Sequence, residues 1–404
     1  MARWDLTTNA SELFKIKYGK LSENVYNSSN VLLARINKKF DFTGSQLFVP
    51  IPQSFSGGVG SGTLPIANAS KTEDALILSK KVYATTEIDR ESIKAASNDE
   101  GSFVRLTKYS VQKAVESYMR NASRILFNDG SGKVALGDGV TAITGTGTSG
   151  DPWLVTLDSG VSNSKEGNIE DADYWDNDAT DGSTNFFEVQ SYNAVTRVVA
   201  LVDVGSPAAP TNADQFYMQG SKNNDPQGLL GVLDAIAGTL YSIPVARRWQ
   251  ATQEDAGGAG LIPDLMNKVM LDVQRKSGKV PNLIVTSFTQ YRKLLNQIED
   301  QKYYVVEPRN QDLKGKISFT GIEFMSAAGP IPVFPERFCE EDRMYFLNDN
   351  FITTHHRPDF GWFDDDGTVF LRKASDDAYE ARYGGYLENY IVPVFHGVLD
   401  NLAL

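Results

Sequence analysis

Cysteine and histidine are scarce in this sequence of 404 residues. The single cysteine, Cys339, cannot form a disulfide within the chain, which agrees with a reducing compartment. Three histidines and one thiol supply too few ligands for a catalytic zinc site. The stretch Met1–Asp5 lacks the apolar core of a signal peptide, so we expect the chain to stay in the cytoplasm where it is made.

Positive charge and long apolar runs are also lacking. Lys and Arg number 39 against 51 Asp and Glu, which gives a formal net charge of −12. That sign is wrong for a protein that holds nucleic acid by neutralising phosphates. No apolar run approaches the ~18 residues that indicate a membrane span, so we expect no membrane contact.

The residues that are present are typical of folded domains. Hydrophobic residues make up 41% and aromatic residues 11% of the chain, which is too much for a disordered protein. A chain of 404 residues exceeds one compact domain, so the sequence predicts two or three packed units.

Residues 1–40 are predicted to form an arm. Short helical patterns appear between Ser11 and Ile36, but Gly19 and an Asn/Ser cluster at 27–30 interrupt them. Such a segment is too short to own a core, so it should pack against the rest of the chain or against a neighbour.

Residues 41–83 predict a long two-stranded hairpin. Extended runs at 45–52 and 75–83 flank a Gly/Ser/Pro/Ala tract that contains the glycines of 57–62. An isolated hairpin of this length is marginal in water, so it should find cover on a partner. A more helical pattern returns at 87–96.

The strongest helix signal comes next. Ser97–Glu100 offers a Ser-x-x-Glu capping box, the apolar residues from Phe103 to Leu126 keep to one face, and Asn128–Gly130 ends the pattern. A helix of about 28 residues is ~40 Å long at 1.5 Å per residue. It would make 84–129 a unit built on one stiff beam.

The composition changes after this helix. Residues 130–224 are rich in Gly, Thr, Ser, Asp and Asn and predict a small, inserted all-β domain. Its expected strands are Trp153–Leu157, Phe186–Gln190, Val195–Val204 and Gln215–Met218.

Helices and strands alternate in 225–350, which predicts an α/β unit, and the rest of the chain, 351–404, is mostly extended. Asp365–Gly367 is predicted to be the turn of a hairpin in that last segment. The helices expected in 225–350 are Gly228–Ala237, Leu261–Arg275 and Phe288–Gln297; the strands are Asn282–Thr286, Ile322–Met325, Ile331–Phe334 and Arg343–Leu347.

Two segments invite comparison with ligand-binding loops. The glycines of 57–62 lack the Gly-Lys-Ser/Thr of a phosphate-binding loop, so a mobile hairpin tip is the better interpretation. Glu166–Asp181 holds seven carboxylates, but a calcium loop starting at Asp176 would need Glu where Phe187 stands. A solvated acidic loop is favoured there, while a nonstandard cation site stays open.

Residues with catalytic potential stand alone. His355 and His356 are adjacent, which on an extended segment points them to opposite faces and prevents them from sharing a metal. Cys339 precedes two glutamates, whose charge disfavours a reactive thiolate. Asp376-Asp377 leaves a glycosidase pair open, but any acidic protein supplies such pairs by chance. We assign no catalytic, cofactor-binding or metal-binding residue and predict a protein that is not an enzyme.

The order of these elements resembles the major capsid proteins of tailed bacteriophages, which have the Hong Kong 97-type shell fold. The order, rather than any one motif, is the specific part of this resemblance. The stretches that carry it are Phe42–Pro50 and Leu78–Ile88 (start and return of the E-loop), Ala95–Phe103 (lead into the spine helix), Asp225–Leu233 and Val280–Tyr291 (the A domain), and Tyr379–Gly397 (the return to the P domain).

The resemblance implies an α+β fold with a named role for each segment. These are an N-arm at 1–40, an E-loop hairpin at 41–83, a P domain with its spine helix at 84–129, an inserted all-β domain at 130–224, an A domain at 225–350, and a C-terminal extended segment at 351–404 that returns to the P domain.

The resemblance also implies a function. Many copies would assemble as hexamers and pentamers into the icosahedral head of a virion, which encloses double-stranded DNA without sequence-specific binding. Portal, scaffolding and decoration proteins are the implied partners; no charged coiled coil precedes the arm, so any scaffold would be a separate protein. Lys71, Lys80 and Lys81 lie in or near the hairpin, but no motif selects one of them, and we assign no cross-link.

Two other classes stay open. An encapsulin-like nanocompartment shell protein is similar in fold, although such chains are usually smaller and lack a long β insertion. A β-rich adhesin or enzyme that binds glycans would use the Asp/Gly/Thr-rich insertion and its aromatic residues Trp153, Tyr174 and Trp175.

Overall fold

A computed structural model describes most of the chain, and it divides into two units. The fold mixes strands and helices, so the predicted α+β class is confirmed. The first unit comprises 1–130, 223–228 and 353–390, and the second comprises 131–222, 229–352 and 391–404. The described residues are 31–54, 62, 71–90, 100–158, 166–179, 184–246, 248–300, 322–326, 329–364, 367–373 and 376–404.

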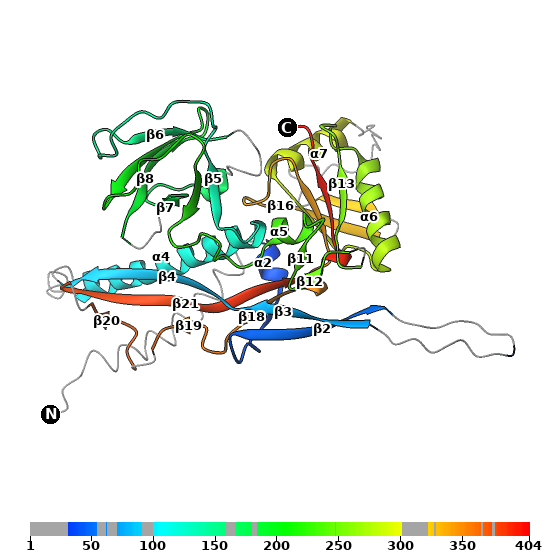
Figure 1. Cartoon of the computed structure of the whole chain (residues 1–404), viewed down its shortest axis with the longest axis horizontal. Coiled ribbons are helices and arrows are strands. Elements are labelled where there is room, and N and C mark those ends of the chain that lie inside the picture. Colours follow the sequence, from blue (N-terminus) through cyan, green and yellow to red (C-terminus); the bar gives the residue numbers. More distant parts are fainter. Residues whose placement is uncertain are drawn as a thin grey trace, which may run out of the picture. The chain divides into compact units, whose positions relative to one another are not determined.

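A six-stranded sheet is the base of the first unit (Figure 1). Its long strand β21 (Ala378–Ile391) pairs antiparallel with β4 (Lys80–Asp89) over ten residues. β20 (Leu371–Arg372) pairs with the same stretch of β21, so it lies on the other side of that strand. The remaining strands are β1 (Asn37–Lys39), β18 (Ile352–His356) and β19 (Gly361–Trp362).

The long helix predicted from the capping box is confirmed as α4 (Glu100–Phe127), which has 28 residues. It packs on β4 through a buried face that includes Val111 and Val115. The ring of Tyr118 lies edge-on to Phe360 and Tyr383, with centroid distances of 5.5 and 5.2 Å. Apolar and aromatic contacts therefore fix the helix on the sheet.

The hairpin predicted in 41–83 is present, but its second strand ends at Leu78, because residues 80–83, which were expected to belong to it, start β4 and pair with β21. β2 (Gln46–Ser54) and β3 (Lys71–Leu78) pair antiparallel, while the predicted tip, apart from Gly62, lies outside the described residues. Before the hairpin come the short helix α2 (Val31–Arg35) and β1, which pairs parallel with β18. Residues 1–30 of the predicted arm lie outside the described part.

The first half of the second unit is a six-stranded sheet with its own core. The side chains of Trp175, Phe187 and Phe216 are fully buried in it. Two four-residue strands in this sheet, β5 (Lys133–Leu136) and β7 (Tyr174–Asn177), were not expected from the sequence. The expected strands are β6 (Trp153–Thr156), β8 (Phe186–Asn193), β9 (Val198–Val204) and β10 (Gln215–Met218).

The second half of that unit is another six-stranded sheet, in the order β13-β22-β17-β14-β16-β15. Its apolar core includes residues of the helices α6 (Pro263–Ser277) and α7 (Phe288–Asp300). The strands are β13 (Thr252–Asp255), β14 (Leu283–Thr286), β15 (Ile322–Ser326), β16 (Gly329–Pro335), β17 (Met344–Leu347) and β22 (Gly397–Asp400); the smaller elements are α5 (Leu229–Leu233), β11 (Thr239–Leu240) and β12 (Ile243–Pro244).

Three expectations about the chain's course are wrong. Residues 87–89 continue β4 rather than starting a helix, because β21 supplies a pairing partner up to Asp89. β19 and β20 do not pair with each other as a hairpin, because each pairs with β21 instead. The segment 351–404 does not return as a whole to the first unit: β22 buries Val398 and Leu399 between β13 and β17 in the second.

Candidate functional site

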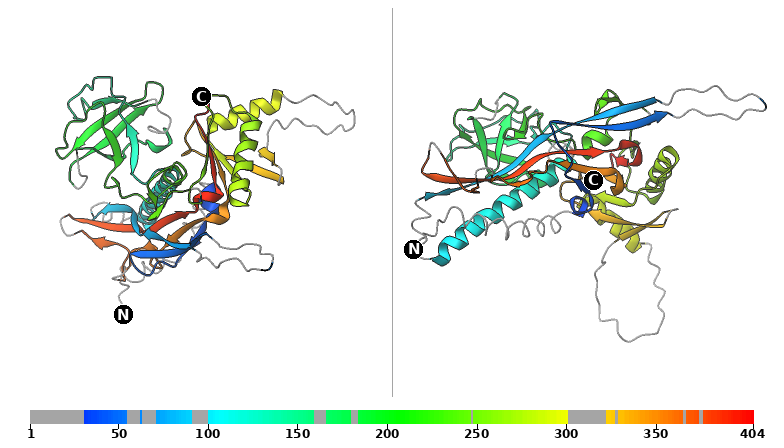
Figure 2. Two further views of the ribbon diagram at one scale, coloured as in Figure 1. Left: turned by 45° about the vertical axis from the view of Figure 1, so that its right-hand side comes forward. Right: turned by 90° about the horizontal axis from the view of Figure 1, so that it is seen from below.

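The hairpin of β2 and β3, drawn in blue, extends beyond the end of β21 (Figure 2). Among its described side chains only Ala75 and Ile77 are buried, whereas Phe48 is 59% exposed and Leu78 is exposed as well. The two strands form a sheet by themselves, and no other described strand pairs with either. An element that leaves apolar side chains and backbone edges open is a candidate contact surface.

Prolines limit how the outer edge of β2 can be used. The amide of Ser79 donates to the carbonyl of Ser45, and hydrogen-bonded pairs alternate along an antiparallel ladder. Pro50 and Pro52 therefore fall at positions whose backbone groups point away from β3. Because proline has no N–H, a partner strand cannot add along that edge in full, and the apolar side chains are the better contacts.

The base of α4 holds a buried charge pair. The guanidinium of Arg124 lies 2.8 Å from the carboxylate of Asp225, and both side chains are almost fully buried. A Cβ on Gly228 would come within 2.3 Å of the carbonyl oxygens of Ile125 and Asn128, so only glycine fits there. The segment 225–228 is thus fixed against the end of α4.

Sequence reasoning missed the role of Glu388. This buried carboxyl group accepts hydrogen bonds from the amides of Gln227 (2.6 Å) and Asn389 (3.2 Å), and the side chain of Asn389 donates to the Gln227 carbonyl. Burial raises the pKa of Glu388 to about 8. Nothing in the local sequence signals this group, because its partner Gln227 is 161 residues away.

The adjacent histidines have separate surroundings, as their predicted opposite orientation requires. Nδ1 of His355 lies 2.7 Å from the carboxylate of Asp41. The ring of His356 stacks on Phe40 at 5.3 Å, and burial lowers the pKa of His356 to about 4. His396 is fully buried, its Nδ1 accepts the amide of Asn348, and burial lowers its pKa to about 3.

In the described part of the acidic segment, Asp176 and Asp178 accept hydrogen bonds from residues in or next to β10. Asp176 is buried and accepts a hydrogen bond from the amide of Gly220, 2.8 Å away. Asp178 accepts from the hydroxyl of Tyr217 at 3.0 Å. Throughout the described ranges no group of three His, Cys, Asp or Glu side chains is arranged to hold a metal, although 180–181 lie outside them.

The other sequence candidates do not come together. Cys339 is buried. Asp376 and Asp377 make ion pairs with Lys373 (2.9 Å) and Arg90 (3.2 Å). Most of the glycine tract at 57–62 lies outside the described residues.

The lysines of the hairpin region each have a local contact. Lys71 pairs with Glu73 at 2.5 Å, Lys80 donates to the carbonyl of Asn223, and Lys81 lies 5.9 Å from the ring centre of Tyr386. None of these contacts singles out one lysine for a covalent bond.

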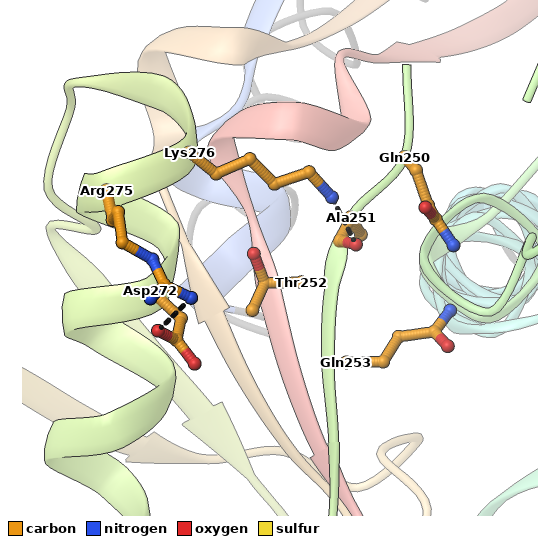
Figure 3. Close-up of a pocket in the computed structure, with 7 residues that line it drawn as sticks. All are labelled: Gln250, Ala251, Thr252, Gln253, Asp272, Arg275 and Lys276. Atoms are coloured by element: carbon orange, nitrogen blue, oxygen red, sulfur yellow. Dashed lines mark hydrogen bonds and ion pairs between the residues drawn. The ribbon is translucent and has the colours of Figure 1, made fainter. Parts of the chain in front are cut away.

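A surface groove of about 390 Å³ lies beside β13 (Figure 3). On one wall, Lys276 donates to the carbonyl of Ala251 at 3.0 Å and Arg275 pairs with Asp272 at 2.9 Å. Gln250 and Gln253 lie on the other wall. Because the two cations already have partners within the groove, it has no feature that selects a ligand.

No helix in the described ranges has the length and apolarity needed to cross a bilayer. The described residues offer one extended, largely exposed element, the hairpin, and several buried polar clusters.

Comparison with known proteins identifies the fold. No protein-family model matches the sequence, and no curated protein sequence matches it. Over 100% of its length the chain is similar to 95% of a chain in the Cyanophage A-1(L) capsid asymmetric unit, with a TM-score of 0.52 and 13% identity. The resemblance to phage capsid proteins of the Hong Kong 97 type is therefore confirmed at the level of the fold.

Two further solved structures match with lower TM-scores. A capsid chain of an empty GTA particle has a TM-score of 0.44 and 10% identity, over 93% of this chain and 91% of that chain. The SrpI encapsulin of Synechococcus elongatus PCC 7942 has a TM-score of 0.40 and 8% identity, over 91% of this chain and 85% of that one.

Proposed function

We propose that this chain is the major capsid protein of a tailed bacteriophage. Many copies assemble as hexamers and pentamers into the icosahedral head, which encloses double-stranded DNA. The observation that carries the proposal is the full-length similarity to a phage capsid chain. The hairpin supports it, because its exposed apolar residues need a surface that the described part of one copy does not supply.

The segments take the roles that the resemblance implies. Residues 1–40 are the N-arm, 41–83 the E-loop, and 84–129 the P domain with α4 as its spine helix. Residues 130–224 form the inserted β domain and 225–350 the A domain. In 351–404, the part up to 390 returns to the P domain, whereas the last strand, β22, belongs to the A domain.

The role is structural and not enzymatic. A net charge of −12 suits a shell that surrounds DNA without adhering to it, since like charges repel. Each contact between copies can be weak, because many of them act on every subunit at once. The protein is made in the host cytoplasm and ends in the virion, with portal, scaffolding and decoration proteins as its partners.

Electron microscopy of the purified full chain tests this proposal. The chain alone, or with a candidate scaffold protein from the same genome, should form uniform hollow particles in negative stain. A monodisperse monomer under every condition would contradict the proposal. Particles that contain a packaged enzyme in place of DNA would favour a nanocompartment shell.

A pair of matched variants tests the part played by the hairpin. Phe48→Asp puts a charge on the hairpin's exposed apolar side and should abolish particles while leaving the melting temperature of the free chain unchanged. Val195→Asp places the same charge at a side chain that is 93% exposed in the β insertion, and should still assemble. Normal particles from Phe48→Asp would exclude this residue from the contact.

A further inference from the structure

The segment 37–42, which leads into the hairpin, is fastened to β18 by contacts that converge on two histidines. The parallel ladder of β1 ends with Lys39 opposite His355, and the amide of Phe42 donates to the carbonyl of His356. Asp41 contacts the ring of His355, and Phe40 stacks on the ring of His356.

His356 has no means of accommodating a positive charge in this position. It is 2% exposed, and neither ring nitrogen has a hydrogen-bond partner in the described residues. The adjoining cavity, lined also by Thr354 and Asn389, has a volume of about 10 Å³, which is room for one water at most. A buried imidazolium without an acceptor is strongly disfavoured.

The ionisable groups around His356 reinforce this. Lys38 and His355 are the neighbours whose charge opposes its protonation. The nearby carboxylate of Asp41 is engaged with His355, and the phenol of Tyr118 lines the cavity. Phe360 closes another side with its ring, 4.8 Å from the His356 ring.

We propose that His356 is an acid-sensitive latch: its protonation releases the segment 37–42 from β18. The neutral ring packs between Phe40 and Phe360, whereas the charged ring needs water, which it can reach only when Phe40 and β1 detach. Four residues after Phe42 the hairpin begins, so release would free the base of β2.

The sign of the pH dependence follows from the two states. In the closed state burial lowers the pKa of His356 to about 4, and in the detached state it returns toward 6.5. Closure is therefore fully favourable above pH 6.5 and weakens as the pH falls toward 4. From these two values the opening equilibrium should rise roughly 70-fold between pH 7.5 and 4.5.

Hydrogen exchange of the full chain, read by mass spectrometry, tests the latch whether or not the chain assembles. After correction for intrinsic exchange rates, peptides covering 37–42 should lose protection on acidification, while peptides of β14 keep theirs. Equal protection of 37–42 at pH 7.5 and 4.5, or equal loss in both peptides, would overturn the proposal.

Two variants separate the latch from a general effect of acid. His356→Phe keeps a flat ring and removes the titration, so 37–42 should stay protected at pH 4.5. His355→Asn removes the contact with Asp41 and should lower protection at both pH values, while the acid step remains. An unchanged acid step in His356→Phe would refute the role of His356; if that variant does not fold, the wild-type comparison of 37–42 with β14 decides.

Discussion

The hairpin of β2 and β3 and the central strands β14 and β17 of the second unit are all antiparallel pairs, but they differ in cover. All eight residues of β14 and β17 are buried. In the hairpin the described side chains are mostly exposed, and two of them are buried. The pair of β14 and β17 completes a core within its own sheet, whereas the hairpin leaves its surface to be covered elsewhere. The same local structure therefore contributes to folding in one place and to contact in the other.

The largest effect should come from a charge in the covered pair. Val285→Asp places a carboxylate in β14 where the native side chain is fully buried. Without a partner it should cost about 4 kcal/mol or more of the free energy of unfolding. Urea denaturation measures this. A loss below about 1 kcal/mol would mean that the sheet is less closed than its burial indicates.

The next largest effect should come from the buried charge pair of the first unit, and it tests whether water is excluded from the interior of that unit. Arg124→Met leaves Asp225 buried without its cation and should cost about 3–5 kcal/mol in urea denaturation. Lys113→Met breaks an exposed pair with Glu116 and should cost at most about 0.5 kcal/mol. Similar costs for the two variants would show that water reaches Arg124.

Local sequence patterns were enough to predict the elements that are determined by residues close together in the chain. The capping box and the apolar face identified α4 to within a few residues, and the Gly-rich tract between two extended runs identified the hairpin. β5 and β7 were missed because each has four residues, too few for a period, and β7 lies in an acidic stretch. β22 was misplaced because Gly397–Asp400 carries no sign of which sheet it joins.

Of the candidate site, the sequence predicted the features that depend on local structure but not those that depend on tertiary packing. Exposure of Phe48 follows from a hairpin without a third strand, which the sequence suggested. The burial of Glu388 and His356 does not follow from their neighbours, because the residues that cover them, Gln227 and Phe40, are distant in sequence. Such groups are fixed by tertiary packing, which no local pattern records.

A smaller, pH-dependent effect should distinguish the closed interior from the surface. Glu388→Gln keeps an oxygen acceptor for the Gln227 amide but cannot ionise. The native pKa of about 8 lies above the ordinary 4.5, so the wild-type chain loses stability as the pH rises between these values. The variant should be more stable than wild type by roughly 4 kcal/mol at pH 8, and by about 1 kcal/mol at pH 5. Glu116→Gln, on the exposed part of α4, is the control, and a gain for Glu388→Gln that does not change with pH would contradict burial as its cause.

The smallest effect on the stability of the free chain should come from a substitution on the exposed side of the hairpin. Phe48→Ala removes a side chain that is already in water, so the free energy of unfolding should change by less than about 0.5 kcal/mol. Ile77→Ala, at a fully buried side chain of β3, should cost about 2–4 kcal/mol.

Assembly should depend on Phe48 although folding of the free chain does not. Burial of the Phe48 side chain between copies should stabilise the particle by on the order of 1–2 kcal/mol per contact. Light scattering should then show that Phe48→Ala needs roughly tenfold more protein to form particles, since ~1.4 kcal/mol is a factor of ten. A Phe48→Ala chain that unfolds like Ile77→Ala would mean that the hairpin is covered within one copy, and the difference between the two pairs of strands would disappear.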